Sequence, residues 1–234
     1  MNHLANFLTT SSLICGFISI IFSLESHFTF ASWAIIFSVM FDGLDGQIAR
    51  KNPIPSEFGK ELDSLVDVVS FGIAPSILGY IFVYKHFYFW ATLALFVYLL
   101  CSVIRLAKFN IISKEKMVDY FYGLPTTASG GIVASFILLY RKYTNLPPPF
   151  IFLVLVLALA YLMVSKIKYL NLDGLKQQLS QNKLLVLGII LILAITLVIF
   201  FLITAKFVPE IIILTLFLIY LLFSPFMVKS AGNS

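Results

Sequence analysis

The sequence predicts an all-α integral membrane protein with about eight transmembrane helices, and two observations lead to that fold class. First, 60% of the residues are hydrophobic and only 12% are charged, with a mean hydropathy of +1.00, whereas soluble domains are about 25% charged. Second, apolar runs such as residues 189–193 lack the polar–apolar alternation that a membrane β-barrel needs. So much apolar surface must face lipid. The composition therefore excludes a cytosolic enzyme, a nucleic-acid-binding domain, a secreted disulfide scaffold and a disordered tail.

The apolar runs are separated by clear turn signals. A membrane-spanning helix needs about 20 apolar residues, so the chain has room for eight at most. In order along the chain, the signals are Glu25-Ser26-His27, Pro53 with Pro55, Lys85-His86, Pro147-Pro148-Pro149, and Lys206 with Pro209. The expected spans are 6–24, 30–51, 58–82, 86–107, 124–140, 147–165, 184–204 and 208–228.

The spans fall into two groups that differ in polarity. Residues 1–165 hold nearly all the polar residues within spans, and they are expected to form a six-helix membrane core. Residues 166–183 are the longest polar stretch and predict a linker on the cytoplasmic surface. Residues 184–234 form a plain apolar hairpin and tail, for which we expect a packing role.

Positive charges predict the orientation in the membrane. With the N-terminus inside and eight alternating spans, twelve of the 16 Lys and Arg residues lie on the inside. Cytoplasmic loops carry the excess of Lys and Arg, so both termini are expected to be cytoplasmic. Arg141 and Lys142 are the one local exception. The net charge of +5 is attributed to basic residues near anionic lipid heads, and no nucleic-acid partner is expected.

Six of the eleven acidic residues lie between Asp42 and Asp67. Asp42 and Asp45 share one face of the second span, and Asp63 and Asp67 share one face of the third. Four carboxylates converging from two antiparallel helices would not all ionise without a cation, and oxygen ligands alone suit Mg²⁺ or Mn²⁺. The alternative is a set of helix-end salt bridges to Arg50, Lys51 and Lys60, which explains one or two of the acids but poorly explains four.

Small residues accompany the acids. Gly46 lies four positions after Asp42, Ala49 four after Asp45, and Gly59 four before Asp63. Without bulky side chains, these positions would leave a groove in which a phosphate or nucleotide could approach the helices. Ordinary helix–helix packing is the alternative, since small residues are common at membrane helix contacts.

Together these residues read Asp42-x2-Asp45-Gly46-x2-Ala49-Arg50-x8-Gly59-x3-Asp63-x3-Asp67, which resembles the signature of the CDP-alcohol phosphotransferase family without a departure. The resemblance implies that the four Asp residues hold two divalent cations, Mg²⁺ or Mn²⁺, and that Asp67 is also the general base. It further implies that Gly46, Ala49, Arg50 and Gly59 face the CDP moiety, and that the protein is a homodimer. Asn6 and Thr9 resemble the family's nucleotide-contacting Asn-x-x-Thr element, with an N-cap as the alternative.

Three flanking stretches resemble the small multi-spanning phosphatidylserine synthases of that family: residues 56–75, 105–110 and 123–128. Gln47 and Lys108 stand where Arg is often expected. The resemblance makes Lys60, Arg105 and Asn110 candidates for binding the serine carboxylate or the lipid phosphate. The alternative for residues 105–110 is a helix end whose basic side chains reach the interface.

The implied reaction transfers the phosphatidyl group from CDP-diacylglycerol to L-serine, giving phosphatidylserine and CMP. The implied location is a prokaryotic cytoplasmic membrane, with the site on the cytoplasmic side. Another acceptor, such as glycerol 3-phosphate or an inositol phosphate, is the first alternative. A cation transporter is the second, but its acids would lie on several spans at different depths.

Overall fold

The computed structural model describes residues 3–51, 57–112, 120–143, 150–170 and 209–231. Within these ranges the chain is almost entirely helical, which confirms the all-α fold class. The elements, in chain order, are α1 (His3–Leu24), α2 (Phe28–Lys51), α3 (Glu57–Asp67), the π-helical segment η1 (Val68–Ile73), α4 (Ala74–Ile112), β1 (Tyr120–Tyr122), α5 (Thr126–Tyr143), α6 (Ile151–Val164), β2 (Lys168–Leu170) and α9 (Pro209–Ala231).

The ends of these helices lie within about five residues of the expected spans, except that the span at 184–204 lies outside the described residues. Among the described residues, three helical stretches are long and apolar enough to cross a membrane: Leu4–Leu24, Phe28–Ile48 and Glu57–Ile111. Ile151–Val164 and Glu210–Pro225 are shorter apolar helices. The described residues thus support a membrane protein and do not confirm the count of eight spans.

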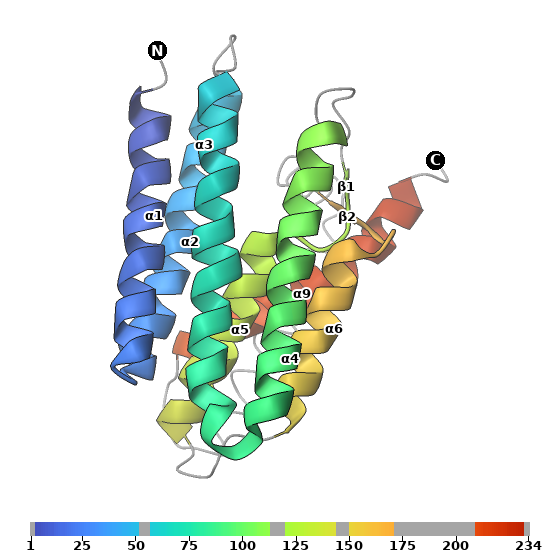
Figure 1. Ribbon diagram of the computed structural model, residues 1–234. Helices are drawn as coiled ribbons and strands as arrows, with labels where there is room; N and C mark the ends of the chain where they lie inside the picture. The colour runs from blue at the N-terminus through green and yellow to red at the C-terminus, as the bar shows by residue number, and fades with distance from the viewer. Residues whose placement is uncertain (1–2, 52–56, 113–119, 144–149, 171–208, 232–234) are drawn as a thin grey trace.

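The longest helical stretch is a hairpin. Figure 1 shows the chain descending through α3, η1 and the first part of α4, reversing at the bottom, and returning upward in the second part of α4. The reversal lies at Phe87, whose φ of −139° and ψ of 46° are not helical. The two spans expected on either side of Lys85-His86 are therefore the two arms of this hairpin.

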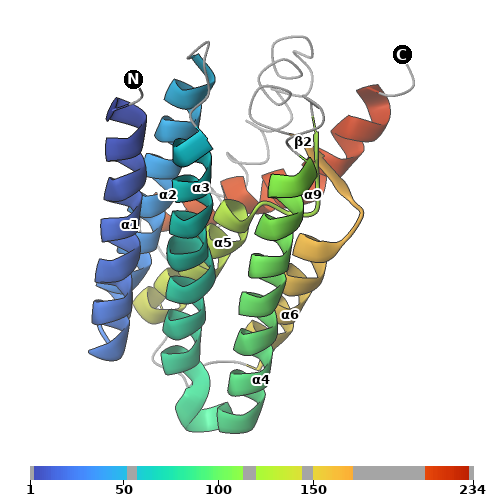
Figure 2. The same ribbon diagram turned by 45° about the horizontal axis from the view of Figure 1, so that its top comes forward.

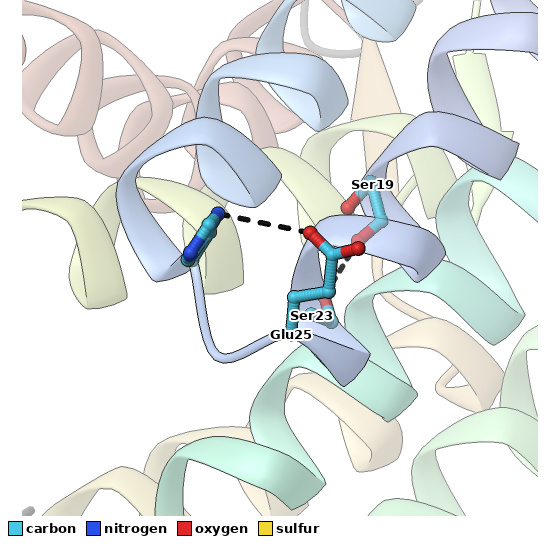
Figure 3. Close-up of polar contacts among 4 residues, drawn as sticks. Ser19, Ser23 and Glu25 are labelled. Carbon is cyan, nitrogen blue, oxygen red and sulfur yellow. Dashed lines mark hydrogen bonds and ion pairs between the residues drawn. The ribbon is translucent and has the colours of Figure 1, made fainter.

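A tight turn connects α1 to α2 at the same end of the bundle. Ser23 Oγ donates a hydrogen bond of 2.7 Å to the Ser19 carbonyl, and the carboxylate of Glu25 lies 3.8 Å from Nδ1 of His27 (Figure 3). Ser26 adopts a positive φ of 61° between them. This turn places α1 and α2 side by side along their lengths (Figure 1).

The core lies between α2, α4, α5 and α6. Phe82 of α4 packs edge-on against Phe152 of α6 and Tyr140 of α5, with ring centroids 5.3 and 5.7 Å apart. Large side chains on the opposite face of α1, such as Phe7 and Phe17, are exposed, as expected of a surface that meets lipid. The bundle therefore has a packed interior and an apolar exterior.

Two three-residue strands, which the sequence did not predict, pair with each other. β1 lies just before α5, and β2 lies just after α6. β1 pairs with β2 in antiparallel register, Phe121 opposite Tyr169, so the start of the expected linker at 166–183 is part of the fold. Gly123 follows β1 with a φ of +80°, and a Cβ there would lie 2.2 Å from the Met163 carbonyl oxygen. Only glycine fits this connection into α5.

The C-terminal helix α9 crosses behind α5 at an oblique angle, which is clearest in Figure 2. It packs against α5 and β2, and the Phe217 ring occupies the space that a side chain at Gly131 would need. Tyr220 of α9 lies near Tyr169, with ring centroids 6.1 Å apart. The described chain begins and ends at the same end of the bundle (Figure 1).

The structure also shows how the exceptional charges Arg141 and Lys142 are accommodated. Lys142 forms an ion pair with Glu210, a carboxylate of α9 that is only 5% exposed. The Arg141 guanidinium lies over the Phe28 ring, 5.2 Å from its centroid, which is cation–π geometry. Both charges therefore hold helices together, and neither needs the cytoplasmic side for stabilisation.

Candidate active site

Three of the four motif aspartates meet between α2 and α3. Asp42, Asp63 and Asp67 each offer a carboxylate oxygen, and these oxygens all lie within 4.8 Å of one another. α2 ends at Lys51 and α3 begins at Glu57 at the top of the bundle in Figure 1, so the two helices run antiparallel and bring their acidic residues together. Asp67 is buried, with 8% of its surface exposed, whereas Asp42 and Asp63 are half-buried, so the cluster stays partly open to solvent.

Asp45 lies beside this group without belonging to the closest trio. Its side chain is 3% exposed, and it is near enough to Asp63 for their charges to interact. Asp42, three positions earlier on α2, is the member of the trio that α2 contributes. The structure thus brings three predicted ligands together and buries the fourth next to them.

The donor set fits a hard divalent cation. All the oxygens are carboxylates, the ligands that Mg²⁺ and Mn²⁺ prefer. Asp67 Oδ1 is buried and has no hydrogen-bond partner among the described residues, although buried polar atoms normally have one. Three carboxylates this close repel one another unless a cation or protons neutralise them. A metal ion would satisfy both the charge and the open oxygen.

Two threonines of α5 connect this cluster to a buried arginine. Thr127 Oγ1 donates a hydrogen bond of 3.1 Å to Asp42 Oδ2. Arg105 Nη1 donates one of 3.1 Å to Thr126 Oγ1, and the guanidinium is close enough to Asp67 and Asp42 to interact with their charges. Arg105 is 7% exposed, and its Nε has no hydrogen-bond partner among the described residues. One positive group with an open donor therefore stands beside the carboxylates.

The π-helical segment η1 begins directly after Asp67. The Ala74 N–H bonds to the Val69 carbonyl, five residues back, and this wider turn changes the angle between Asp67 and the helix below it. Tyr98 is fully buried, and its Oη donates a hydrogen bond of 3.1 Å to the Phe71 carbonyl. Ser129 Oγ donates one of 3.1 Å to the same Oη. Tyr98 therefore ties η1 to both α4 and α5.

Removing this hydroxyl is expected to destabilise the protein. Tyr98→Phe leaves the Phe71 carbonyl without its partner in a dry interior, which costs about 1–3 kcal/mol. We expect a lower Tm in detergent, measured by thermal unfolding of the purified protein. Tyr161→Phe is the matched control, because Tyr161 is 68% exposed on α6. An equal Tm for both variants would contradict a role of Tyr98 in holding η1.

Comparison with known proteins agrees with this site. The family model described as CDP-alcohol phosphatidyltransferase matches residues 2–224. The chain belongs to the CDP-alcohol phosphatidyltransferase family. It is similar to the CDP-diacylglycerol–serine O-phosphatidyltransferase of Helicobacter pylori (strain ATCC 700392 / 26695), with 38% identity over 179 residues, or 75% of each chain.

Two further relatives come from distant organisms. The protein of the same name in Bacillus subtilis (strain 168) is 35% identical over 170 residues, which cover 72% of this chain and 90% of the relative. The archaetidylserine synthase of Methanothermobacter thermautotrophicus (strain ATCC 29096 / DSM 1053 / JCM 10044 / NBRC 100330 / Delta H) is 35% identical over 161 residues, 68% of this chain and 66% of the relative. Membership of the family confirms the resemblance inferred from the Asp motif.

The structure describes some of the other residues that the family motif implies, and omits the side chains of others. Gly46 and Gly59 are half-buried on α2 and α3, whereas the side chains of Ala49 and Arg50 lie outside the described part of the chain. Asn6 and Thr9 lie inside α1, which begins at His3, so the N-cap alternative is wrong. Thr9 is buried, and its Oγ1 donates a hydrogen bond of 3.0 Å to the Ala5 carbonyl.

The three candidates for anion binding differ in their surroundings. Asn110 Oδ1 accepts a hydrogen bond of 3.0 Å from Ser64 Oγ, next to Asp63 in sequence. Lys60 is exposed at the start of α3. Arg105 is the only one of the three that is buried beside the carboxylates. Arg105 is therefore the candidate whose charge interacts with Asp67 and Asp42.

The sequence analysis missed Thr126, Thr127 and Tyr98 as parts of the site. Residues 123–128 stood out only through the resemblance, without a role for either hydroxyl. A threonine pair at the start of a helix has the pattern of a cap, and a single tyrosine in an apolar helix has the pattern of core. No local signal distinguished them.

Proposed function

We propose that this protein transfers the phosphatidyl group from CDP-diacylglycerol to the hydroxyl of L-serine, producing phosphatidylserine and CMP. The observation that carries the proposal is the carboxylate trio of Asp42, Asp63 and Asp67 in a chain of this family. The proposed acceptor rests on the relatives: the Helicobacter and Bacillus proteins share one name that contains serine, and the Methanothermobacter name differs in the lipid but also contains serine. A shared acceptor across such distances favours serine here.

The four aspartates are proposed to hold two divalent cations, Mg²⁺ or Mn²⁺. When bound, such ions neutralise the diphosphate of the donor and stabilise the departing CMP. Asp42 and Asp45 contribute from α2, and Asp63 and Asp67 from α3. Gly46, Ala49, Arg50 and Gly59, with Asn6 and Thr9 of α1, are proposed to contact the CDP moiety.

Asp67 is proposed as the general base. It accepts the proton of the serine hydroxyl while that oxygen attacks the phosphorus attached to the lipid. A bond from the serine oxygen to phosphorus forms, and the bond from phosphorus to the bridging oxygen breaks, so CMP leaves with the electron pair. The buried Arg105 guanidinium is proposed to bind the serine carboxylate or the lipid phosphate, with Lys60 and Asn110 as the other candidates.

The arrangement in the membrane is also a proposal. Both described ends of the chain lie at the end of the bundle where α2 ends and α3 begins (Figure 1), so the proposed cytoplasmic termini and the proposed cytoplasmic site share one side of the membrane. Serine and CMP are soluble, whereas the acyl chains stay in the bilayer. We propose residues 1–165 as the catalytic core, residues 166–183 as a linker, residues 184–234 as a C-terminal hairpin and tail, and a homodimer as the assembled protein.

A panel of acceptors tests the function. The purified protein is given CDP-diacylglycerol and a divalent cation with L-serine, glycerol 3-phosphate or inositol phosphate, and CMP release is measured. We expect serine to support the highest rate, with CMP and phosphatidylserine formed in equal amounts. A reaction without acceptor measures hydrolysis and is subtracted. A higher rate with glycerol 3-phosphate or inositol phosphate would keep the reaction and overturn the acceptor.

A further inference from the structure

Two adjacent hydroxyls at the start of α5 serve two different groups. Thr127 Oγ1 donates to Asp42 Oδ2 at 3.1 Å, and Thr126 Oγ1 accepts from Arg105 Nη1 at 3.1 Å. Successive residues in a helix point about 100° apart, so one turn of α5 contacts the metal-binding carboxylates and the guanidinium at once. Thr126 is fully buried and Thr127 is half-buried.

The backbone that carries the two threonines is held firmly by its neighbours. The Gly123 N–H bonds to the Ile167 carbonyl at 2.8 Å, and the Leu124 N–H bonds to the Leu162 carbonyl at 3.0 Å. The positive φ of Gly123 fits the chain against the end of α6. The start of α5 is therefore fixed by α6 and the β1–β2 ribbon, and the position of the two hydroxyls does not depend on a substrate.

Arg105 has capacity for a ligand beyond Thr126. Its Nε is buried without a hydrogen-bond partner among the described residues, and the guanidinium has five N–H donors in a fixed plane. An anion in that plane would lie near Asp67 and Asp42, whose charges already interact with Arg105. The hydrogen bond from Nη1 to Thr126 fixes the rotation of the guanidinium, and so the direction of its open donor.

We propose that Thr126 and Thr127 are positioning residues that set the spacing between the metal-binding carboxylates and the anion-binding arginine. Thr127 acts through Asp42, and Thr126 acts through Arg105. The inference rests on the proposed function, because transfer needs the cation-bound donor and the acceptor held in one geometry. It assigns a separate task to each of two neighbouring residues, so the two tasks are measurable independently.

The two valine variants are expected to fail in different measurements. Thr127→Val removes the donor that orients Asp42, and losing such a partner of a ligand weakens metal binding about 10- to 100-fold. Thr126→Val removes the acceptor of a charge-assisted hydrogen bond, which predicts a rise of about tenfold in the KM for serine. Each variant should leave the other quantity within about twofold of the unsubstituted protein.

The experiment uses the full-length protein in detergent. Mn²⁺ is titrated into it and free Mn²⁺ is followed by electron paramagnetic resonance, which needs no turnover. The KM for serine is then measured at saturating Mn²⁺. Thr92→Val is the matched control, since Thr92 is exposed and its hydroxyl bonds only to the Tyr88 carbonyl of its own helix at 2.9 Å. Thr127→Ser and Thr126→Ser keep the hydroxyl and should restore both quantities.

The outcomes separate this inference from the proposed function. The inference is overturned if both valine variants show the same loss of Mn²⁺ affinity and the same rise in the KM for serine. It is also overturned if neither variant changes either quantity. Where a valine variant does not remain monodisperse, the alanine variant at the same position is measured in its place. If the unsubstituted protein prefers another acceptor, serine is wrong as the substrate. The Mn²⁺ affinity of Thr127→Val and the KM of Thr126→Val for the preferred acceptor are then measured instead.

Discussion

Asp67→Asn is expected to remove most of the serine-dependent CMP release while the protein still folds. The substitution keeps the size of the side chain and takes away both a cation ligand and the proton acceptor. General-base contributions amount to about 10²–10⁴-fold in rate, and weaker cation binding adds to this loss. Asp67 is buried against two other acids, so the neutral amide lowers repulsion and should not destabilise the helix pair.

The measurement is CMP release per folded protein, with folding judged by the size-exclusion profile and the Tm. Glu25→Gln is the control, because Glu25 is an exposed acid in the α1–α2 turn (Figure 3). In Figure 1 the α1–α2 turn lies at the bottom, whereas α3 begins at the top, so that variant should keep its full rate. A well-folded Asp67→Asn protein that releases CMP at a near-normal rate would remove Asp67 from the reaction.

Chelation is expected to have the second large effect. With carboxylates as the ligands, EDTA should abolish CMP release, and added Mg²⁺ or Mn²⁺ should restore it. The physical reason is that a diphosphate donor and several carboxylates carry the same sign of charge, and only a cation lets them meet. The rate is followed as EDTA is titrated against a fixed amount of Mg²⁺.

Calcium provides a control for this experiment, because it binds oxygen ligands but accepts a looser geometry than Mg²⁺. We expect Ca²⁺ to raise the Tm of the chelated protein without restoring the full rate. Undiminished CMP release after thorough chelation would contradict a role for divalent cations and leave Arg105 as the principal positive group at the site.

Much of the architecture was predictable because membrane helices are encoded by composition over long stretches. The expected limits of the first two spans, 6–24 and 30–51, differ from α1 and α2 by three residues or fewer. Pro53 and Pro55 predicted the break between the two acidic faces, and α2 and α3 end and begin on either side of them. The spacing of the aspartates then predicted that their side chains would share one place, because helical periodicity determines direction.

The rest depends on contacts between distant segments, which leave little local trace. The π-helical segment η1 has an ordinary apolar sequence, and its shape is held by Tyr98, 27 positions after Phe71. The pairing of β1 with β2 requires that the start of α5 lie beside the end of α6. Thr127 lies 85 positions from Asp42, so the sequence around either residue does not predict their hydrogen bond.

The contacts of α9 have a consequence for the biogenesis of this enzyme. Glu210 pairs with Lys142 from 68 positions later in the chain, and Phe217 fills the space beside Gly131. A chain synthesised from its N-terminus inserts all four aspartates before this last helix leaves the ribosome, and contacts of such separation form late. The helix that carries Thr126 and Thr127 is therefore incompletely packed until α9 has been synthesised and inserted. A membrane-inserted nascent chain that still lacks α9 would therefore hold the acids of its site without the support that α9 gives to α5.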